Sequence, residues 1–309
     1  MIRRLCVIGV GLIGGSLARA LRQAQAVGEV VGAGRDPRHL QQAVELGVID
    51  RYSTDLAEAV SGADMVVVCV PLGAMEAVFR RIAPALESEA VLTDVGSAKG
   101  CVVAAARAAF GAPPPRFVPG HPIAGTEKSG VAASFAELFV RHRVILTPLA
   151  TTDPEAHARV RAMWEAAGAE VVDMDVALHD EVLAATSHLP HLLAFTTVDT
   201  LARMHDHEEI FRYAAGGFRD FTRIAASDPV MWRDICLFNR DAILAVLGRF
   251  RDELAEVEQA VREGDGAALL ERFRRAKAAR DAHAALLNRQ ESGDRKSEVG
   301  SQKSEGRNS

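Results

Sequence analysis

The amino-acid sequence predicts an α/β domain followed by an all-α domain, and three observations support this division. Up to about residue 174, short apolar runs alternate with helical patterns. From about Asp175 the β-branched runs disappear, and helical periodicity continues for more than a hundred residues. The final stretch, 291–309, has almost no apolar residue. We therefore expect domains at 1–174 and 175–290, followed by a disordered tail at 291–309.

The first strand and turn organise the first domain. An apolar run stops at Gly9, the G-x-G-x-x-G spacing is met by Gly9, Gly11 and Gly14, and a helical pattern follows at once. In such a turn the first glycine allows a tight bend, the second lets a pyrophosphate approach the backbone, and the third lets helix and strand pack closely. The stretch predicts a Rossmann-type dinucleotide-binding domain with cofactor contacts at Gly9, Gly11, Leu12, Ile13 and Gly14.

The same stretch has an alternative interpretation as a secretory signal, because Arg3 and Arg4 precede an apolar run. Removal of a signal would delete the first strand and the phosphate turn. Five glycines would also make a poor signal helix. The dinucleotide-binding interpretation is therefore favoured.

The end of the second strand, Glu29–Ala33, bears on the choice of cofactor. An acidic residue there suits the ribose 2′-hydroxyl of NAD, whereas an arginine suits the 2′-phosphate of NADP. Here Gly34 and Arg35 follow the strand. Asp36 precedes a proline and a helical pattern, so we interpret it as a helix N-cap. Gly34 and Arg35 favour NADP, and NAD stays open.

Further elements follow in order. Continuous apolar strands indicate a parallel sheet covered by helices on both faces. Strands are expected at 64–70, 90–94, 116–119, 143–147 and 169–173, and helices at 74–86, 98–109 and 154–167. In the second domain we expect one long helix from Asp228 past Leu254, a break at 264–266, and a last helix to about Asn288. Its wide apolar faces predict a homodimer formed through this domain.

Composition narrows the class of protein. The chain has 309 residues, 49% hydrophobic and 25% charged, and a formal net charge of −5, so we expect no nucleic-acid partner. The most apolar long segment, 182–204, carries charged residues, histidines and a proline, so no membrane insertion is expected. The four cysteines lack metal-ligand spacing. They indicate reduced thiols in a cytoplasmic protein without a metal site.

Two stretches in the first domain carry candidate chemistry. Asp94–Lys99 follows a parallel strand at the edge where such sheets bind ligands, and Ser97 within it is either a plain N-cap or a hydrogen-bonding group of the site. His121 lies between Gly120 and Pro122, which places it on a rigid loop rather than on a packed face. A histidine is the natural proton acceptor near neutral pH for a dehydrogenase.

The helical domain adds a third group of candidates. His188 and His191 lie around Pro190, and they are either site residues or satisfied imidazoles of a kinked core helix. Arg219 and Arg223 are either anion-binding groups or partners of Asp220 and Asp228, and we expect one of them to be such a partner.

In these motifs, the sequence resembles the prephenate/arogenate dehydrogenases of tyrosine biosynthesis, and the resemblance covers about residues 4 to 288. Many dehydrogenases share the glycine turn, but four further stretches in this order are specific to the family. They are Asp94–Lys99, Gly120–Gly125, Ser187–His191 and Gly217–Arg223.

The resemblance implies oxidative decarboxylation of a cyclohexadiene that bears a ring carboxylate and a C4 hydroxyl. It implies that His121 takes the hydroxyl proton, that Ser97 orients His121 and the hydroxyl, and that Arg223 binds the ring carboxylate. His188, His191 and Glu127 are implied at the substrate pocket. Many members carry Asp where Gly34 and Arg35 stand here, so the family's use of NAD does not transfer directly.

Two other functions are compatible with parts of the sequence. A β-hydroxyacid dehydrogenase has a similar outline but uses a lysine in its helical domain, and no lysine occurs between Lys128 and Lys277. A non-enzymatic NAD(P)-sensing dimer would need neither a substrate arginine nor a loop histidine. The residues leave open the choice between prephenate and arogenate and any feedback inhibition by tyrosine.

Overall fold

The computed structural model describes residues 1–126, 128–205 and 207–305, and the chain forms two compact units, Met1–Val246 and Leu247–Ser309. The first unit contains the sheets, the candidate site and helices up to the first turns of α12. The second contains the rest of α12 together with α13. The functional boundary expected at 174/175 stays a prediction.

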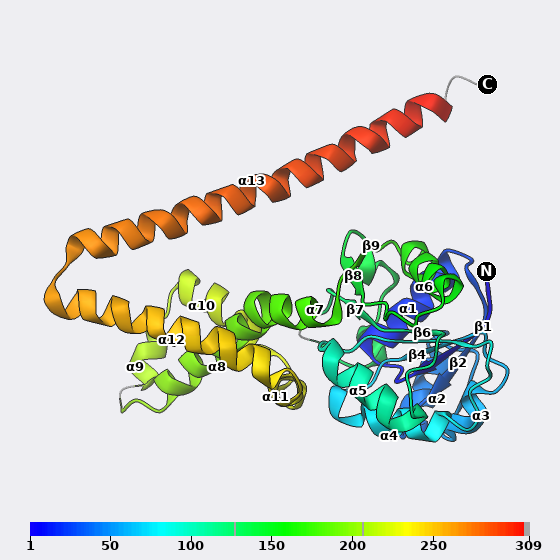
Figure 1. Ribbon diagram of the computed structural model, residues 1–309. Helices are drawn as coiled ribbons and strands as arrows, with labels where there is room; N and C mark the ends of the chain where they lie inside the picture. The colour runs from blue at the N-terminus through cyan, green and yellow to red at the C-terminus, as the bar shows by residue number, and fades with distance from the viewer. Residues whose placement is uncertain (127, 206, 306–309) are drawn as a thin grey trace. The chain divides into compact units, whose positions relative to one another are not determined.

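A six-stranded parallel sheet forms the centre of the first unit (Figure 1). Its strand order is β3-β2-β1-β4-β5-β6, as in a dinucleotide-binding fold. The strands are β1 Ile2–Ile8, β2 Val27–Ala33, β3 Arg51–Ser53, β4 Met65–Val68, β5 Val91–Asp94 and β6 Phe117–Val118.

Both faces of this sheet are buried, which explains why its strands are continuously apolar. Alternate residues of β1 enter different cores: Leu5 and Val7 pack with one cluster, Cys6 and Ile8 with the other. Helices α1 Leu12–Gln23, α2 Pro37–Glu45 and α6 Pro154–Ala166 cover the first face. Helices α3 Leu56–Val60, α4 Met75–Ile82 and α5 Lys99–Phe110 cover the second.

A second sheet of three strands corrects the expected single sheet. It consists of β7 Gly120–Pro122, β8 Arg143–Leu146 and β9 Glu170–Asp173, with β7 antiparallel to β8. Of the last three expected strands, the one near 116–119 joins the larger sheet as β6. The strands near 143–147 and 169–173 form β8 and β9 of the second sheet. His121 pairs with Ile145 across β7 and β8. It therefore lies in a buried strand, 9% exposed, and not on the loop that we expected.

Helices α7 Val176–Leu183 and α8 Leu189–Ala202 are joined by a π turn, Ala184–His188. Pro190 has no backbone N–H for an i→i−4 hydrogen bond, which accounts for the disturbed helix at this point. The turn buries His188. Helices α9 His207–Arg212, α10 Gly216–Thr222 and α11 Pro229–Phe238 follow, and α7 packs against α5.

The long helix expected from Asp228 is broken at Asn239 into α11 and α12 Arg240–Glu263. The prediction of a continuous helix was therefore wrong, because the Asn239 side chain turns inward and bonds to Asp180 and His188. The start of the helix was right, since the Asp228 carboxylate accepts from the N–H groups of Val230 and Met231.

In the second unit, Gly264 takes a left-handed conformation with φ of 70° and ends α12 at the expected break. Arg272 on α13 donates to Glu253 on α12 at 2.6 Å, and it also pairs with Glu256. Helix α13 is assigned over Gly266–Glu305, beyond the expected end at Asn288. The disorder of the tail in solution stays a prediction.

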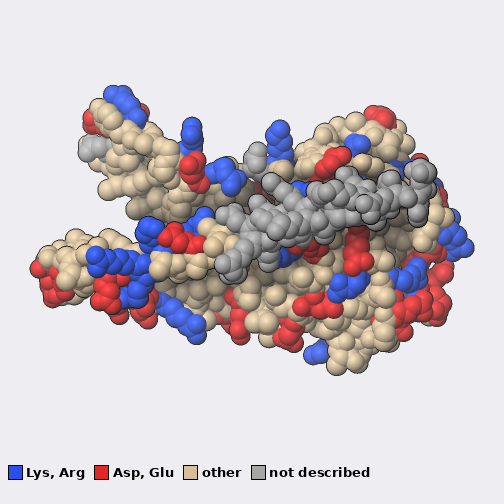
Figure 2. Space-filling view, turned by 90° about the horizontal axis from the view of Figure 1, so that it is seen from above, with Lys and Arg blue, Asp and Glu red and all other residues tan. Residues whose placement is uncertain are grey.

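Charged side chains of both signs are interspersed on the face drawn in Figure 2. Among the described residues, no helix is both long and apolar enough to cross a membrane.

Candidate active site

The glycine turn between β1 and α1 has the geometry that a pyrophosphate needs. Gly9 has φ of 94°, and a Cβ there would lie 2.3 Å from the Cys69 carbonyl oxygen. A Cβ on Gly14 would lie 2.5 Å from the Gly9 carbonyl oxygen. A Cβ on Gly11 would meet nothing within 4 Å. Gly9 and Gly14 are therefore required by the turn itself, whereas Gly11 faces open space where a ligand can approach the backbone.

A cavity of about 550 Å³ extends from this turn along the carboxyl ends of β1, β2 and β4. Gly34 and Arg35 line it, together with Arg81 on α4. Asp36 also lines it, but its carboxylate accepts from the Arg38 N–H at 2.9 Å and caps α2 as predicted. The residues present therefore fit a dinucleotide with its pyrophosphate at the start of α1.

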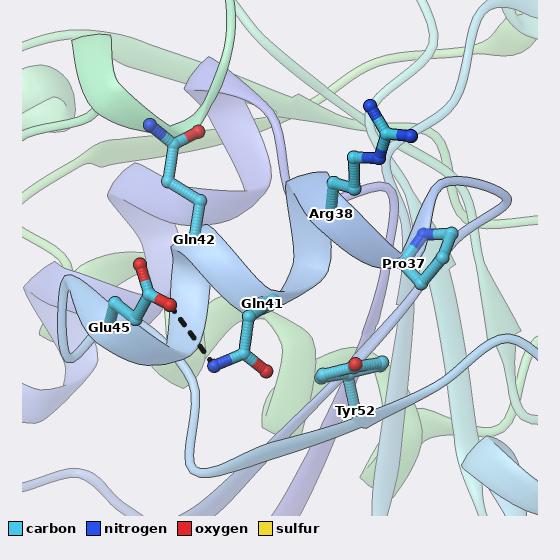
Figure 3. A pocket seen from close by; sticks show the side chains of 6 residues that line it. All are labelled: Pro37, Arg38, Gln41, Gln42, Glu45 and Tyr52. Atoms are coloured by element: carbon cyan, nitrogen blue, oxygen red, sulfur yellow. Dashed lines mark hydrogen bonds between the residues drawn. The ribbon is translucent and has the colours of Figure 1, made fainter.

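A separate hollow lies on the outer side of α2 (Figure 3). Polar side chains of α2 and Tyr52 of β3 form it, and Gln41 donates to Glu45 at 3.2 Å. It includes none of the residues of the glycine turn.

His121 is the first member of a hydrogen-bonded series of side chains. Its Nδ1 lies 2.9 Å from Nε2 of His179 on α7, and His179 is fully buried. Nδ1 of His179 lies 2.8 Å from Oδ1 of Asp180. Asp180 accepts two further bonds at the start of α5, from the N–H groups of Lys99 at 2.7 Å and Gly100 at 2.8 Å. The histidine is thus connected through α7 to the first turn of α5.

A buried ion pair holds the strand that carries His121. The Lys99 ammonium, fully buried, donates to Asp94 Oδ2 at 2.5 Å and to the Gly120 carbonyl at 2.6 Å. The Gly120 N–H donates to Asp94 Oδ1 at 3.2 Å. Both backbone groups of the residue before His121 are therefore bonded to this pair, and the carboxylate and the ammonium satisfy each other away from water.

The surroundings of His121 favour its neutral form. Burial lowers the pKa of His121 well below its ordinary value of 6.5, and its charge interactions with His179, Lys99 and His188 lower it further. Burial also lowers the pKa of His179, although the bond to Asp180 opposes this. For Asp180, burial raises the pKa, but the hydrogen bonds from His179, Lys99 and Gly100 outweigh burial and the net pKa is lowered. At neutral pH the series therefore contains neutral imidazoles and one carboxylate.

Two further histidines lie against Trp232 of α11. The His188 ring accepts from Asn239 Nδ2 at 3.1 Å, and burial lowers the pKa of His188 to about 4. The His191 ring stacks on Trp232 with centroids 3.8 Å apart, and its Nδ1 donates to the Ser187 carbonyl at 2.8 Å. Burial lowers the pKa of His191, and the nearby charge of Arg223 adds to this. Helix α8, which carries His191, also packs against the turn Arg223–Ala226.

The structure places the remaining candidates as follows. Ser97 is half-buried, and within the described residues its hydroxyl has no partner; the N-cap of α5 is Ala98, so the plain-cap interpretation of Ser97 was wrong. Arg219 and Arg223 are exposed and form no ion pair within the described part of the chain. The expected partner Asp228 is used as a helix cap instead. Glu127 lies outside the described residues.

The sequence interpretation missed His179, Asp180 and Asn239, and it quoted Asp94 and Lys99 without giving them a role. These five residues link the end of β5 to α7 and to the break between α11 and α12. Their only sequence signal is that Asp94 and Lys99 flank a turn at the carboxyl edge of the sheet. A His-Asp pair inside a helical pattern has no distinctive spacing.

The fold and the site together define an NAD(P)-dependent dehydrogenase, with a dinucleotide cavity at the sheet edge and a buried neutral histidine on the adjoining small sheet. Comparisons with known proteins agree with this class. The model of the nucleotide-binding domain of prephenate dehydrogenase matches residues 17–173, and that of its dimerization domain matches residues 175–275. The chain belongs to the prephenate dehydrogenase family.

Individual relatives cover nearly the whole chain. A cyclohexadienyl dehydrogenase of Zymomonas mobilis is 40% identical over 90% of this chain and 95% of its own length. A prephenate dehydrogenase of Bacillus subtilis is 36% identical over 90% of this chain and 75% of its own. Among solved structures, prephenate dehydrogenase from A. aeolicus with hydroxyphenyl propionate and NAD+ is 38% identical, with a TM-score of 0.83 over 91% of this chain and 98% of its own.

Proposed function

We propose that the protein converts prephenate, or its amine analogue arogenate, by NAD(P)-dependent oxidative decarboxylation. The observation that carries the proposal is the buried, neutral imidazole of His121 beside the edge of the sheet where the dinucleotide cavity opens. Such a group can accept a proton near neutral pH. Family membership supports the substrate class.

In the proposed reaction, the His121 ring nitrogen that does not face His179 takes the proton of the C4 hydroxyl. A nicotinamide dinucleotide held at the glycine turn would supply the hydride acceptor for C4. The ring carboxylate leaves as carbon dioxide, and its bonding pair makes the ring aromatic. The proton held by His121 returns to the C4 oxygen, which becomes a phenol.

The substrate is held by side chains that the fold leaves available. Arg223 is exposed, has no described partner and lies near His191, which suits it to bind the ring carboxylate in a bidentate manner. The unpartnered hydroxyl of Ser97 orients the C4 hydroxyl and His121. His188, His191 and Glu127 complete the pocket at the side-chain end of the substrate.

We infer a preference for NADP over NAD. Gly34 has no carboxylate for a ribose 2′-hydroxyl, and Arg35 lines the cavity with no ion-pair partner in the described part of the chain. Arg81 lines the same cavity and adds positive charge.

We also infer a cytoplasmic homodimer. The four cysteines are free, which is typical of a reducing compartment. Helices α11 and α12 expose large apolar side chains, including Leu237 at 63% and Leu244 at 57%. A match to the family's dimerization domain covers both helices.

A two-by-two assay of prephenate and arogenate against NAD and NADP tests the proposal. We expect turnover with at least one substrate and a higher kcat/KM with NADP. Absence of turnover in all four combinations would contradict the function. It would favour an NAD(P)-sensing dimer instead.

A further inference from the structure

We propose that His179 and Asp180 are positioning residues that fix the proton of His121 on Nδ1, so that its Nε2 is free to accept the substrate proton. The inference rests on the proposed role of His121 as the base. It states which atom donates and which accepts in each hydrogen bond from Asp180 through His179 to His121.

The hydrogen bond between Asp180 and His179 has a fixed donor and acceptor. An ionised carboxylate only accepts hydrogen bonds, and Asp180 is held in that form by the N–H groups of Lys99 and Gly100. Nδ1 of His179 lies 2.8 Å from its Oδ1. At this distance Nδ1 of His179 must carry the hydrogen, since two lone pairs facing each other would repel.

The donor and acceptor of the His179–His121 hydrogen bond follow from the neutral state of His179. Burial keeps His179 neutral, and a neutral imidazole carries only one hydrogen. With that hydrogen on Nδ1, the Nε2 of His179 is an acceptor. It lies 2.9 Å from Nδ1 of His121, so His121 donates through Nδ1 and keeps a lone pair on Nε2.

The opposite arrangement is disfavoured by the same contacts. If His121 accepted through Nδ1, His179 would have to donate through Nε2. His179 would then be a buried imidazolium, or it would turn a lone pair toward the Asp180 carboxylate. The first state is disfavoured because burial and the charge of Lys99 both lower the pKa of His179, and the second sets two lone pairs against each other in a dry site.

The rest of the fold holds this series in place. Asn239, at the break between α11 and α12, donates to the Asp180 carbonyl at 2.9 Å. Asp180 also occupies the start of α5, whose own cap residue, Ala98, has no side-chain hydrogen bond. Asp180, the partner of the His179 ring, is thus held by the start of α5 and by Asn239, and His121 is held by the Asp94–Lys99 pair through Gly120.

The first test observes the hydrogens directly. In protein labelled with 15N-histidine, two-bond 1H–15N correlations distinguish the two neutral tautomers, and His121→Asn and His179→Gln variants assign the signals. We expect His121 with its hydrogen on Nδ1 and a lone pair on Nε2. A hydrogen on Nε2 of His121 would overturn the proposal without any measurement of activity.

The second test compares two replacements of His179. The Gln carbonyl can accept from His121 Nδ1, whereas Leu of similar bulk cannot. We expect His179→Leu to lower kcat by about 10-fold or more, and by no more than the roughly 10²- to 10⁴-fold that a positioned base contributes. The substrate KM is expected to change by less than about 3-fold. His179→Gln is expected to recover at least about 5-fold of that loss.

Controls separate this role from packing. His157→Gln, in α6, removes a histidine that pairs with Asp173 on the surface and is expected to keep wild-type kcat. Thermal unfolding identifies a variant that fails to fold, and in that case the tautomer measurement on the wild-type protein decides. Equal activity of the Leu and Gln variants would overturn the proposal.

The failures of the two proposals are distinguishable. If His121→Asn keeps wild-type kcat, the proposed base is wrong and the series has no catalytic role. If His121→Asn is inactive but His179→Leu is as active as the wild type, only the positioning role is wrong.

Discussion

At the residue scale, Arg223 has an unusual position for a guanidinium group. It is exposed and unpaired among the described residues, and its positive charge lowers the pKa of the His191 imidazole. A free arginine beside a half-buried ring is suited to a planar carboxylate ligand, and lysine could not reproduce the bidentate geometry.

Arg223→Ala is therefore expected to raise the KM for the dienyl substrate by about 10-fold or more, while the KM for the dinucleotide stays nearly unchanged. Steady-state kinetics with each substrate varied in turn measures both constants. Arg203→Ala is the control, because Arg203 is exposed at the C-cap of α8 and pairs with Asp199. Equal losses for substrate and cofactor would point to a folding defect.

Arg35 gives a second prediction at this scale. Arg35→Ala is expected to lower kcat/KM for NADP by about 10-fold and to leave that for NAD almost unchanged, since only NADP carries the 2′-phosphate. Arg38→Ala, a nearby exposed arginine outside the cavity, is the matched control. A wild-type preference for NAD that the Arg35 substitution leaves unchanged would refute the assignment.

Single residues were predictable from sequence where local chemistry decides their role. The N-cap Asp36 and the helix start at Asp228 follow from an acidic residue before proline, and both carboxylates accept backbone N–H bonds in the structure. His179 and Asp180 were not predictable, because their partners are 58 and 81 positions away in the sequence. Only the packing of α7 on α5 brings these groups together.

At the element scale, the glycine turn makes a prediction that separates fold from ligand. Gly9→Ala places a Cβ against the Cys69 carbonyl and is expected to lower thermal stability. Gly11→Ala meets open space, so we expect an unchanged melting temperature but a KM for the dinucleotide raised by about 10-fold or more. Differential scanning fluorimetry and cofactor titration measure the two effects. Loss of stability in the Gly11 variant would contradict the assignment.

The alternation of strands and helices was predictable because buried parallel strands have continuous apolar runs. Three features of the fold were not predictable in this way. The second sheet depends on β7, only three residues long, which periodicity does not detect. The break at Asn239 depends on side-chain bonds to Asp180 and His188, which are distant in sequence. The π turn was anticipated only as a kink at Pro190.

At the scale of the whole molecule, the exposed apolar residues of α11 and α12 predict association. We expect light scattering to give about twice the chain mass of 33.1 kDa. Leu237→Glu combined with Leu244→Glu is expected to shift the protein toward monomer, because both side chains are more than half exposed in the single chain. Leu46→Glu, at the C-cap of α2 and 42% exposed, is the control. A monomeric wild-type protein would contradict the inference.

The central claim is that a buried, neutral His121 accepts the substrate proton. Burial, His179, Lys99 and His188 all lower its pKa, so the active neutral form persists below pH 6.5. We expect wild-type kcat/KM to be flat through neutrality and to fall only as pH drops through this lowered pKa, as the imidazole becomes protonated. The ionisation therefore lies lower than that of an ordinary imidazole.

The most direct measurement is the pH dependence of kcat for His121→Asn beside the wild-type protein, with His157→Asn as the control. We predict a kcat lowered by about 10²- to 10⁴-fold, the usual contribution of a positioned base, with little change in substrate KM and no remaining acid-side ionisation. A folded His121→Asn protein that retains more than about a tenth of wild-type kcat, or keeps the wild-type ionisation, would contradict the account.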